Sequence, residues 1–244
     1  DFMKESGYHH KNEINVHCDE WVKEPMYNYE MHMNFFTEGS NPVFYNYYKD
    51  VFKKLVRIND KTYEYKFTDE DFYVYMTAHA YKHYSYGGSG VRTLIDYYVF
   101  LKAKSDTMDI DYVLDELDKL GLTEFEASMR KTSLHIFSGN ADLTDEEASV
   151  LKFMSESGTY GNSVNKIKNT SKLLNANSKP QYIFRLIFPN VAYYKKWFPI
   201  AYKYPVLIPF VWVYRLFRGV FKRRDRVEND LRTVKKMDND SFKK

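Results

Sequence analysis

Glu30 and His32 are the first candidates in the chain for a metal-binding or catalytic role. They stand two positions apart in a run that alternates polar with apolar residues, so a strand would present both side chains on one face. A carboxylate there could bind a divalent metal ion, and the imidazole could orient it or contact a phosphate. The alternatives are a solvated or cross-strand-paired acid and an ordinary strand histidine.

His79 and His83 form a second candidate. Their spacing of four residues places two imidazoles on one face of a helix, as in zinc sites. However, no Glu follows His79 directly, and Cys18 lies far away in the sequence. Hydrogen bonding beside the glycine-rich turn that follows is therefore the favoured role of this pair.

That turn, Gly-Gly-Ser-Gly at residues 87–90, is a third candidate, for an anion. Glycines allow close approach of the backbone. If they open a helix near Val91, its amides would suit a phosphate, with Lys82 and Arg92 adding positive charge. A flexible connection between two helices is an equal alternative, since no Walker pattern is present. Arg92 and Asp96, one helical turn apart, would form an ion pair that, if buried, could orient a ligand or lock the helix against the upstream domain.

Composition places the chain among globular proteins. Of its 244 residues, 44% are hydrophobic and 28% charged, which suffices for one or two packed cores. Aromatic residues make up 18%, with only 10 Gly and 7 Pro, so we expect long helices with Tyr-rich faces. The net charge of +3 is too small to imply nucleic-acid binding by itself. The single cysteine, Cys18, excludes an internal disulfide and favours packing in a reducing compartment, the cytoplasm by default.

The first expected element is the end of a helix, closed by Gly7. The chain is therefore expected to start inside an element, with no initiator Met or signal peptide before it. Residues 14–22 and 26–35 are short runs rich in β-branched or aromatic residues, separated by a Glu-Pro pair, which predicts a β-hairpin. Over residues 44–55 apolar residues recur at three- and four-residue steps. This predicts a helix, and no further strand is expected.

Capping signatures predict the helix starts that follow. Thr68, Thr123 and Thr144 are each followed three residues later by an acid. Together with the apolar periodicity, they predict a compact helical bundle. The five expected helices are residues 71–84, 91–102, 109–120, 124–137 and 145–155.

The carboxyl-terminal part is less regular. The polar stretch 165–179 is the best candidate for a linker or mobile segment. Residues 205–217 are almost wholly apolar, but such a run is too short to cross a bilayer, which needs about 20 residues. Residues 203–226 join it to a basic cluster that could lie along an anionic membrane surface; the favoured alternative is a helix packed on the protein itself, with a solvated basic end. The tail 228–244 is predicted to be one fraying helix.

Residues 79–96, HAYKHYSYGGSGVRTLID, resemble the central signature of a bacterial family of uncharacterised nucleotidyltransferases in the DNA polymerase β superfamily. That family pairs a His-rich helix with a Gly-containing turn and an Arg-x-x-x-Asp helix. A strand carrying Glu-x-His precedes them, here residues 30–32. Residues 158–161 and the basic carboxyl-terminal end also resemble the later portion of the family, so the resemblance covers nearly the whole chain.

The resemblance implies a polymerase β-type nucleotidyl-transfer domain followed by a helical substrate domain. It implies Mg²⁺-dependent transfer from a nucleoside triphosphate to an unknown hydroxyl acceptor, with Glu30 as the third metal-binding carboxylate. The first two carboxylates are expected in a missing amino-terminal segment upstream of Asp1, since no Asp-x-Asp stands near the start of the chain, so the chain alone is expected to have little activity. The resemblance also implies a nucleotide or acceptor pocket lined by Lys82, His83, Gly88, Arg92 and Asp96.

We therefore expect an α+β chain of three parts. These are a small remnant antiparallel sheet or hairpin in residues 1–38, a helical substrate-domain bundle in 39–160, and a Pro-punctuated, aromatic and basic helical region in 161–244. Two other functions stay open. The chain could be a non-catalytic module that recognises a nucleotide or a protein partner, or a membrane-peripheral factor in cell-surface polymer assembly.

Overall fold

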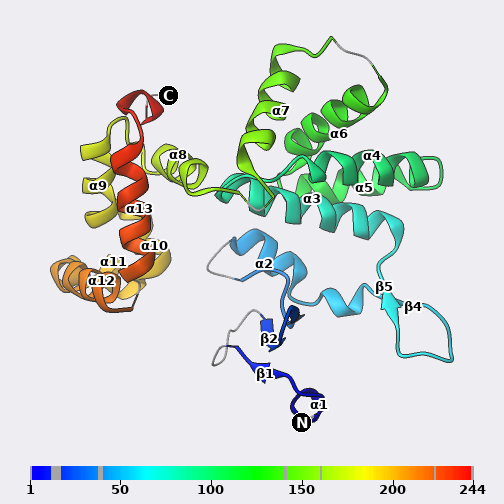
Figure 1. Cartoon of the computed structure of the whole chain (residues 1–244), viewed down its shortest axis with the longest axis horizontal. Coiled ribbons are helices and arrows are strands. Elements are labelled where there is room, and N and C mark those ends of the chain that lie inside the picture. The colour runs from blue at the N-terminus through cyan, green and yellow to red at the C-terminus, as the bar shows by residue number, and fades with distance from the viewer. Residues whose placement is uncertain are drawn as a thin grey trace. The chain divides into compact units, whose positions relative to one another are not determined.

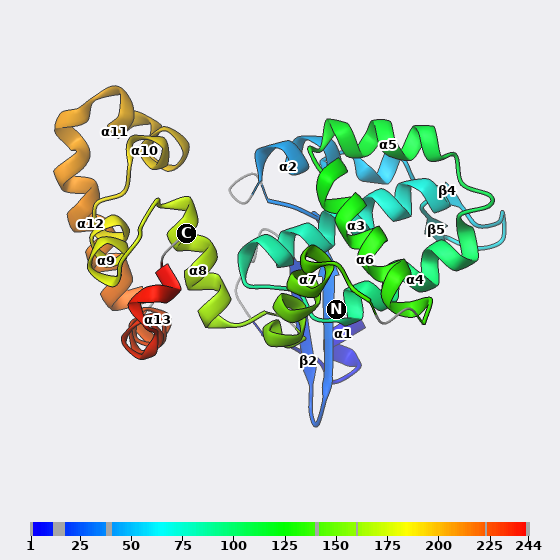
Figure 2. The ribbon, with the colours of Figure 1, turned by 90° about the horizontal axis from the view of Figure 1, so that it is seen from above.

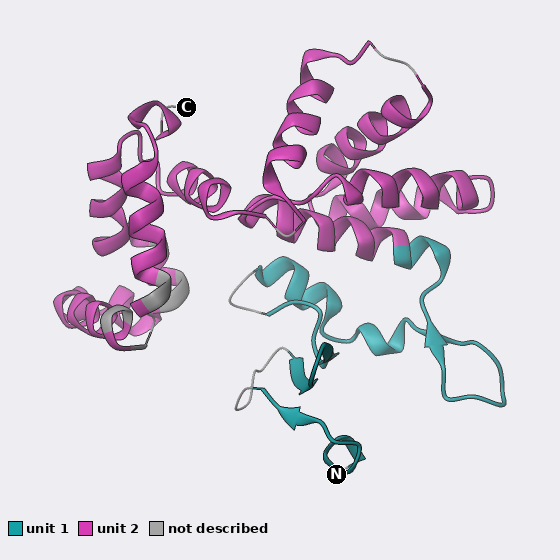
Figure 3. Ribbon diagram, viewed as in Figure 1, with its two compact units in different colours: residues 1–72 teal, residues 73–244 magenta. Residues whose placement is uncertain are grey.

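The computed structural model describes residues 2–11, 18–37, 41–139, 142–159, 161–222 and 224–242. The chain forms two compact units, residues 1–72 and 73–244 (Figure 3). Short antiparallel strands lie in the first unit, and helices follow in the second (Figure 1). The expected α+β class is therefore confirmed, while the three-part division at residues 38 and 160 stays a prediction.

The first unit opens with a short helix and the predicted hairpin. Helix α1, Phe2–Glu5, is followed by Gly7, whose φ of +82° is one that glycine adopts readily, so the expected helix end is confirmed. Strands β2, Cys18–Lys23, and β3, Tyr27–His32, pair antiparallel and confirm the hairpin. Residues 14–17 of the first predicted run lie outside the described residues.

Three short strands are missing from the sequence prediction. Strand β1, His9–His10, extends the hairpin to the order β1-β2-β3. Strands β4, Val56–Arg57, and β5, Tyr65–Lys66, form a separate antiparallel hairpin, whose loop receives hydrogen bonds from the Arg57 guanidinium. The expectation that no strand follows the first hairpin is therefore wrong. Strands of two residues are too short to show a period of two, so the sequence pattern does not reveal them.

Between the two sheets lie α2, Pro42–Tyr48, and a 3₁₀ turn, Val51–Lys53. The single helix expected over residues 44–55 is therefore wrong, because the α-helix ends halfway through it. The helix and the turn each bury apolar residues, Phe44 and Val51 among them. This shared burial produces a helix-like spacing across a break in the helix.

The second unit contains the predicted bundle, and all five expected helices are confirmed. They are α3, Asp69–Tyr86, α4, Arg92–Lys104, α5, Ile110–Lys119, α6, Thr123–Phe137, and α7, Asp145–Ser157. Helix α3 starts in the last residues of the first unit. Buried Tyr73 of α3 packs edge-to-face on Tyr97 of α4 with ring centroids 5.7 Å apart, and the Tyr97 hydroxyl donates to Thr77. Helices α3 and α4 thus carry tyrosines on their buried faces.

Two of the three predicted capping residues are confirmed. Thr144 and Glu147 form a reciprocal capping box at the start of α7. At the start of α3, the Thr68 hydroxyl accepts a hydrogen bond of 3.1 Å from the amide of Asp71. These side chains satisfy amides that have no partner inside the helix, which is why the sequence marks these helix starts correctly.

The predicted cap at Thr123 is wrong. Thr123 is the first residue of α6, and Leu122 occupies the capping position without a side-chain hydrogen bond. Glu126, expected to close a capping box, is buried in the bundle instead. Its carboxylate accepts hydrogen bonds from the Tyr73 hydroxyl at 2.6 Å and from Arg130 Nε at 2.9 Å. Buried Glu126 therefore links α6 to α3 through Tyr73 and does not cap a helix.

Further helices follow the bundle in the described chain. They are α8, Ser163–Leu173, α9, Lys179–Ile187, α10, Val191–Trp197, α11, Pro199–Lys203, α12, Ile208–Lys222, and α13, Arg224–Lys236. Helix α8 leads from α7 to the remaining helices (Figure 2). No helix among the described residues is long and apolar enough to cross a membrane.

The linker predicted at residues 165–179 is wrong. Most of it forms α8, whose first turn is capped by the Asn162 side chain. Ile167 of α8 is fully buried and shares a hydrophobic core with Tyr182 of α9 and Val234 of α13. Because one apolar residue anchors a helix that is otherwise rich in Asn and Lys, composition alone suggests a loop where a packed helix exists.

The carboxyl-terminal end also differs from the prediction. Helix α13 ends at Lys236, and a 3₁₀ turn, Asn239–Phe242, follows it. Phe242 is buried, and its ring centroid lies 5.6 Å from that of Tyr182. A single fraying helix over 228–244 is therefore wrong, because an aromatic side chain anchors the end of the described chain.

Candidate functional site

Strand β3 presents Glu30 and His32 together on one exposed face. Their side chains approach each other, with 3.6 Å between His32 Nε2 and Glu30 Oε2. Asn28, two residues earlier, has its amide nitrogen 3.5 Å from Glu30 Oε1. The Glu30 side chain is 47% exposed, so solvent or a ligand can reach it. The predicted alternation of the strand therefore places both candidate groups within reach of one ligand.

Glu20 on β2 is a residue of this face that the sequence prediction misses. The register of the hairpin makes Glu20 the Cα partner of Glu30, and Cys18 the partner of His32. Paired residues of an antiparallel ladder point to the same face. The Glu20 side chain is only 16% exposed, and its Oε2 lies 3.4 Å from Lys11 Nζ. The turn has three residues, Glu24 to Met26, so counting outward from its central residue, Pro25, gives this register.

The pKa of the buried Cys18 thiol reflects the negative charge on this face. Burial raises the pKa of the Cys18 thiol above its ordinary value, and the negative charges of Glu20 and Glu30 raise it further. Both carboxylates thus act on the same point of the face. The thiol stays protonated and packs as a small apolar group, as expected for this single cysteine.

Two opposed carboxylates suit a hard divalent cation. Like charges directly opposite each other destabilise a sheet, and a bound cation would relieve this repulsion. Carboxylate oxygens are the ligands that Mg²⁺ prefers in proteins. Among the described residues no group of three or more His, Cys, Asp or Glu could hold a metal ion. Glu20 and Glu30 thus offer the type of donor atom that Mg²⁺ prefers, and binding of the ion by them stays a prediction.

His79 and His83 on α3 contact each other, as their spacing predicts. Their Nε2 atoms lie 3.2 Å apart, and the rings are nearly perpendicular with centroids 4.6 Å apart. Burial lowers the pKa of His83, and the positive charge of Lys82 lowers it further. A neutral imidazole can accept a hydrogen bond from its partner, so hydrogen bonding accounts for the pair.

The glycine-rich turn between α3 and α4 is buried against the segment that joins α7 and α8. A Cβ added at Gly88, whose φ is +101°, would lie 2.1 Å from Ser157 Oγ, and one at Gly90 would lie 2.7 Å from the carbonyl oxygen of Gly158. The amides of Gly87 and Gly88 both donate to the His83 carbonyl and close α3. Close packing within the chain therefore accounts for these glycines, and contact of Gly88 with a nucleotide stays a prediction.

Arg92 and Asp96 lie one turn apart on the exposed side of α4. The pKa of the Asp96 carboxyl is raised above its ordinary value, because the effect of partial burial exceeds the opposing effect of the positive charge of Arg92. Lys82 is half-buried near the end of α3. The structure thus gathers these residues along the α3-turn-α4 segment of the second unit, whereas Glu30 belongs to the first unit.

The small antiparallel sheet with its acidic face is followed by the His-rich helix, the glycine turn and the Arg-x-x-x-Asp helix, in the order expected for a nucleotidyltransferase-like chain. Residues 1–138 match a family described as uncharacterised nucleotidyltransferases, and the chain belongs to this family. The matched range includes both candidate segments and ends before residues 158–161 and the basic carboxyl-terminal end. Neither the curated proteins nor the solved structures contain a match to this chain.

Proposed function

We propose that this protein transfers a nucleoside monophosphate from a nucleoside triphosphate to a hydroxyl acceptor, with Mg²⁺ held in part by Glu30. Membership of a nucleotidyltransferase family supports nucleotidyl transfer and a nucleotide substrate. The observation that carries the metal-binding role is the register that sets Glu30 opposite Glu20 on an exposed strand face.

In this reaction the acceptor hydroxyl loses its proton to solvent and its oxygen forms a bond to the α-phosphorus, while the bond from that phosphorus to the oxygen bridging the α- and β-phosphates breaks and pyrophosphate leaves. Mg²⁺, when bound, would neutralise charge on the triphosphate. Glu30 would contribute an oxygen ligand, and His32, 3.6 Å away, would orient that carboxylate. Glu20, less exposed and paired with Lys11, would be a second oxygen donor on the same face.

The nucleotide or acceptor is proposed to contact the α3-turn-α4 segment. Arg92 is the first residue of α4, where the positive end of the helix dipole favours phosphate, and its guanidinium can bind phosphate oxygens in pairs. Asp96, one turn further, and Lys82 and His83 at the end of α3 would complete the contacts. Buried Gly88 would contribute backbone only.

The alternative is a non-catalytic module that binds a nucleotide or a protein partner. The observation that favours it is the packing of the glycine turn on Ser157 and Gly158, which accounts for the glycines without any ligand. The two proposals differ in one outcome: the module would release no pyrophosphate from ATP.

Calorimetric titration of the full-length protein with ATP and Mg²⁺ tests the proposal. Glu30→Gln and Arg92→Ala are expected to weaken binding by about tenfold or more, the loss typical of altered metal and phosphate contacts. Glu24→Gln, an exposed acid in the turn of the same hairpin, and Lys152→Ala, an exposed cation on α7, are matched controls. Unchanged affinity in both test variants would remove these assignments.

A further inference from the structure

Helix α12 has one face that is fixed to its own unit. Trp212 Nε1 donates a hydrogen bond of 2.5 Å to the hydroxyl of Tyr194 on α10, and its ring meets Phe188 at 4.8 Å between centroids. On the same side, the Arg215 guanidinium donates to the carbonyls of Leu186 and Ile187 at the end of α9. Arg215 therefore holds the helix in place, which is the role that cations play at helix carboxyl ends.

The opposite face of α12 is apolar and exposed. Phe210, Val213, Phe217 and Phe221 follow one another at steps of three or four residues, so they form one stripe along the helix. Their exposed fractions are 70%, 54%, 59% and 75%. Val206, in the turn before the helix, is 75% exposed and extends the apolar surface. A contiguous apolar surface of this kind marks an interaction site.

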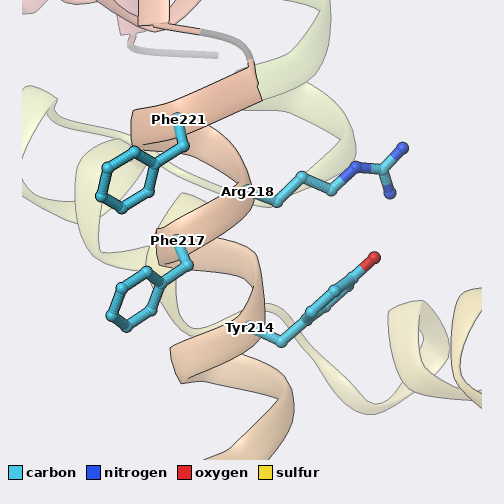
Figure 4. Close-up of a pocket in the computed structure, with 4 residues that line it drawn as sticks. All are labelled: Tyr214, Phe217, Arg218 and Phe221. Carbon is cyan, nitrogen blue, oxygen red and sulfur yellow. The ribbon is translucent and has the colours of Figure 1, made fainter.

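Two rows of side chains on this helix enclose a shallow hollow of about 370 Å³, lined by Tyr214, Phe217, Arg218 and Phe221. Phe217 and Phe221 point to one side and stack on each other, while Tyr214 and Arg218 point to the other (Figure 4). One helix thus presents two aromatic rings beside an exposed guanidinium. This combination suits a molecule with an apolar part next to a phosphate.

The stretch of chain that contains α12 is strongly basic. Residues 157–224 contain thirteen Lys and Arg and no Asp or Glu, although the net charge of the whole chain is only +3. Tyr202 and Tyr204, both exposed, flank Lys203 just before α12. Tyrosine is enriched at membrane interfaces, and basic residues are drawn to anionic headgroups. The basic charge of this stretch is therefore complementary to anionic headgroups, and the exposed phenylalanine stripe of α12 is complementary to the apolar interior of a bilayer.

We propose that α12 and the turn before it bind the surface of an anionic membrane, with the phenylalanine stripe in the boundary between headgroups and acyl chains and Arg218 on a lipid phosphate. A helix of 15 residues with a basic flank lies in the plane of the interface rather than across it. A nucleic acid would contact the cations and stack on the aromatic rings, but this binding mode does not account for exposed Val206 and Val213. The surface lies outside residues 1–138, so this inference does not depend on nucleotidyl transfer.

Flotation of the full-length protein with vesicles tests the proposal. The protein is expected to float with phosphatidylcholine vesicles that contain phosphatidylglycerol, to bind pure phosphatidylcholine more weakly, and to lose binding at high salt. Phe217→Ser with Phe221→Ser is expected to weaken binding by at least tenfold, because two exposed rings no longer enter the bilayer. Arg218→Gln is expected to weaken binding about fivefold, the effect of one basic residue near an anionic surface.

Leu173→Ser and Lys172→Gln are matched controls, since both change exposed residues of the same unit on α8. Phe217→Trp keeps an aromatic ring and is expected to bind normally, with fluorescence quenched by lipids brominated in their acyl chains. The proposal is overturned if the wild-type protein stays in solution with anionic vesicles. It is also overturned if the phenylalanine variant folds, as shown by its circular dichroism, and floats like the controls, or if all variants bind only RNA in a salt-dependent manner.

Discussion

Glu20 and Glu30 are Cα partners on neighbouring antiparallel strands, so two carboxylates stand opposite each other on one face of the sheet. Lys11 Nζ lies 3.4 Å from Glu20, and His32 Nε2 lies 3.6 Å from Glu30. Direct opposition of like charges opposes folding, and sheets keep it only where another interaction compensates for it. A divalent cation bound between the two carboxylates would relieve this repulsion.

The first prediction concerns the stability of the hairpin. Glu30→Gln removes the repulsion from Glu20 and is expected to raise the free energy of unfolding by about 0.2–1 kcal/mol, the range for cross-strand pairs. Thermal unfolding without metal measures this change, with Glu24→Gln as the control. If Glu30 instead stabilises the strand through His32, the variant melts at a lower temperature. That result would contradict the proposed repulsion between Glu20 and Glu30.

The second prediction concerns the glycine turn. Gly88→Ala is expected to destabilise the protein by at least about 2 kcal/mol, because the backbone has positive φ and the new methyl group overlaps Ser157. Gly121→Ala is the matched control, since Gly121 also has positive φ, at +65°, with open space around it. Urea unfolding separates the two effects. Equal losses in the two variants would show that backbone strain alone is at stake and that the packing of the turn on α7 contributes nothing.

The third prediction concerns acid unfolding. The amide of Thr144 lowers the pKa of the Glu147 carboxyl from 4.5 to about 2, with further help from the Thr144 hydroxyl and from His135, against the opposing effect of burial. Because the folded-state pKa lies below the unfolded one, Glu147 stabilises the fold above pH 4.5, and this contribution is lost as the pH falls toward 2. Glu147→Gln should therefore flatten the pH dependence of the melting temperature in this window. An unchanged pH profile would contradict the role of this capping box.

The helices and the family could be predicted from the sequence because their signals are local. Apolar periodicity and the caps at Thr68 and Thr144 fix helix starts within a few residues, and the resemblance in residues 79–96 is borne out by the family match. The failures have a physical cause in tertiary contact. The segment 165–179 looks like a loop until Ile167 is seen inside a core formed with α9 and α13.

The candidate site shows the same limit. Glu30 could be singled out from the alternation along its own strand. Glu20 becomes a candidate only when the pairing register places it opposite Glu30, and the pattern along one strand does not give that register. The glycines of residues 87–90 suggested close approach to a ligand. Their observed neighbours are Ser157 and Gly158, which are far away in the sequence and therefore invisible to local reasoning.

The most direct measurement is nucleotidyl transfer itself. Full-length wild-type protein and Glu24→Gln, incubated with Mg²⁺ and ATP labelled at the α-phosphate, are expected to release pyrophosphate and to transfer the label. Glu30→Gln is expected to lose at least about a hundredfold of this rate, as for removal of one electrostatic contact to the reacting phosphate. Transfer by Glu30→Gln at the wild-type rate would contradict the proposal that this carboxylate binds the catalytic metal ion.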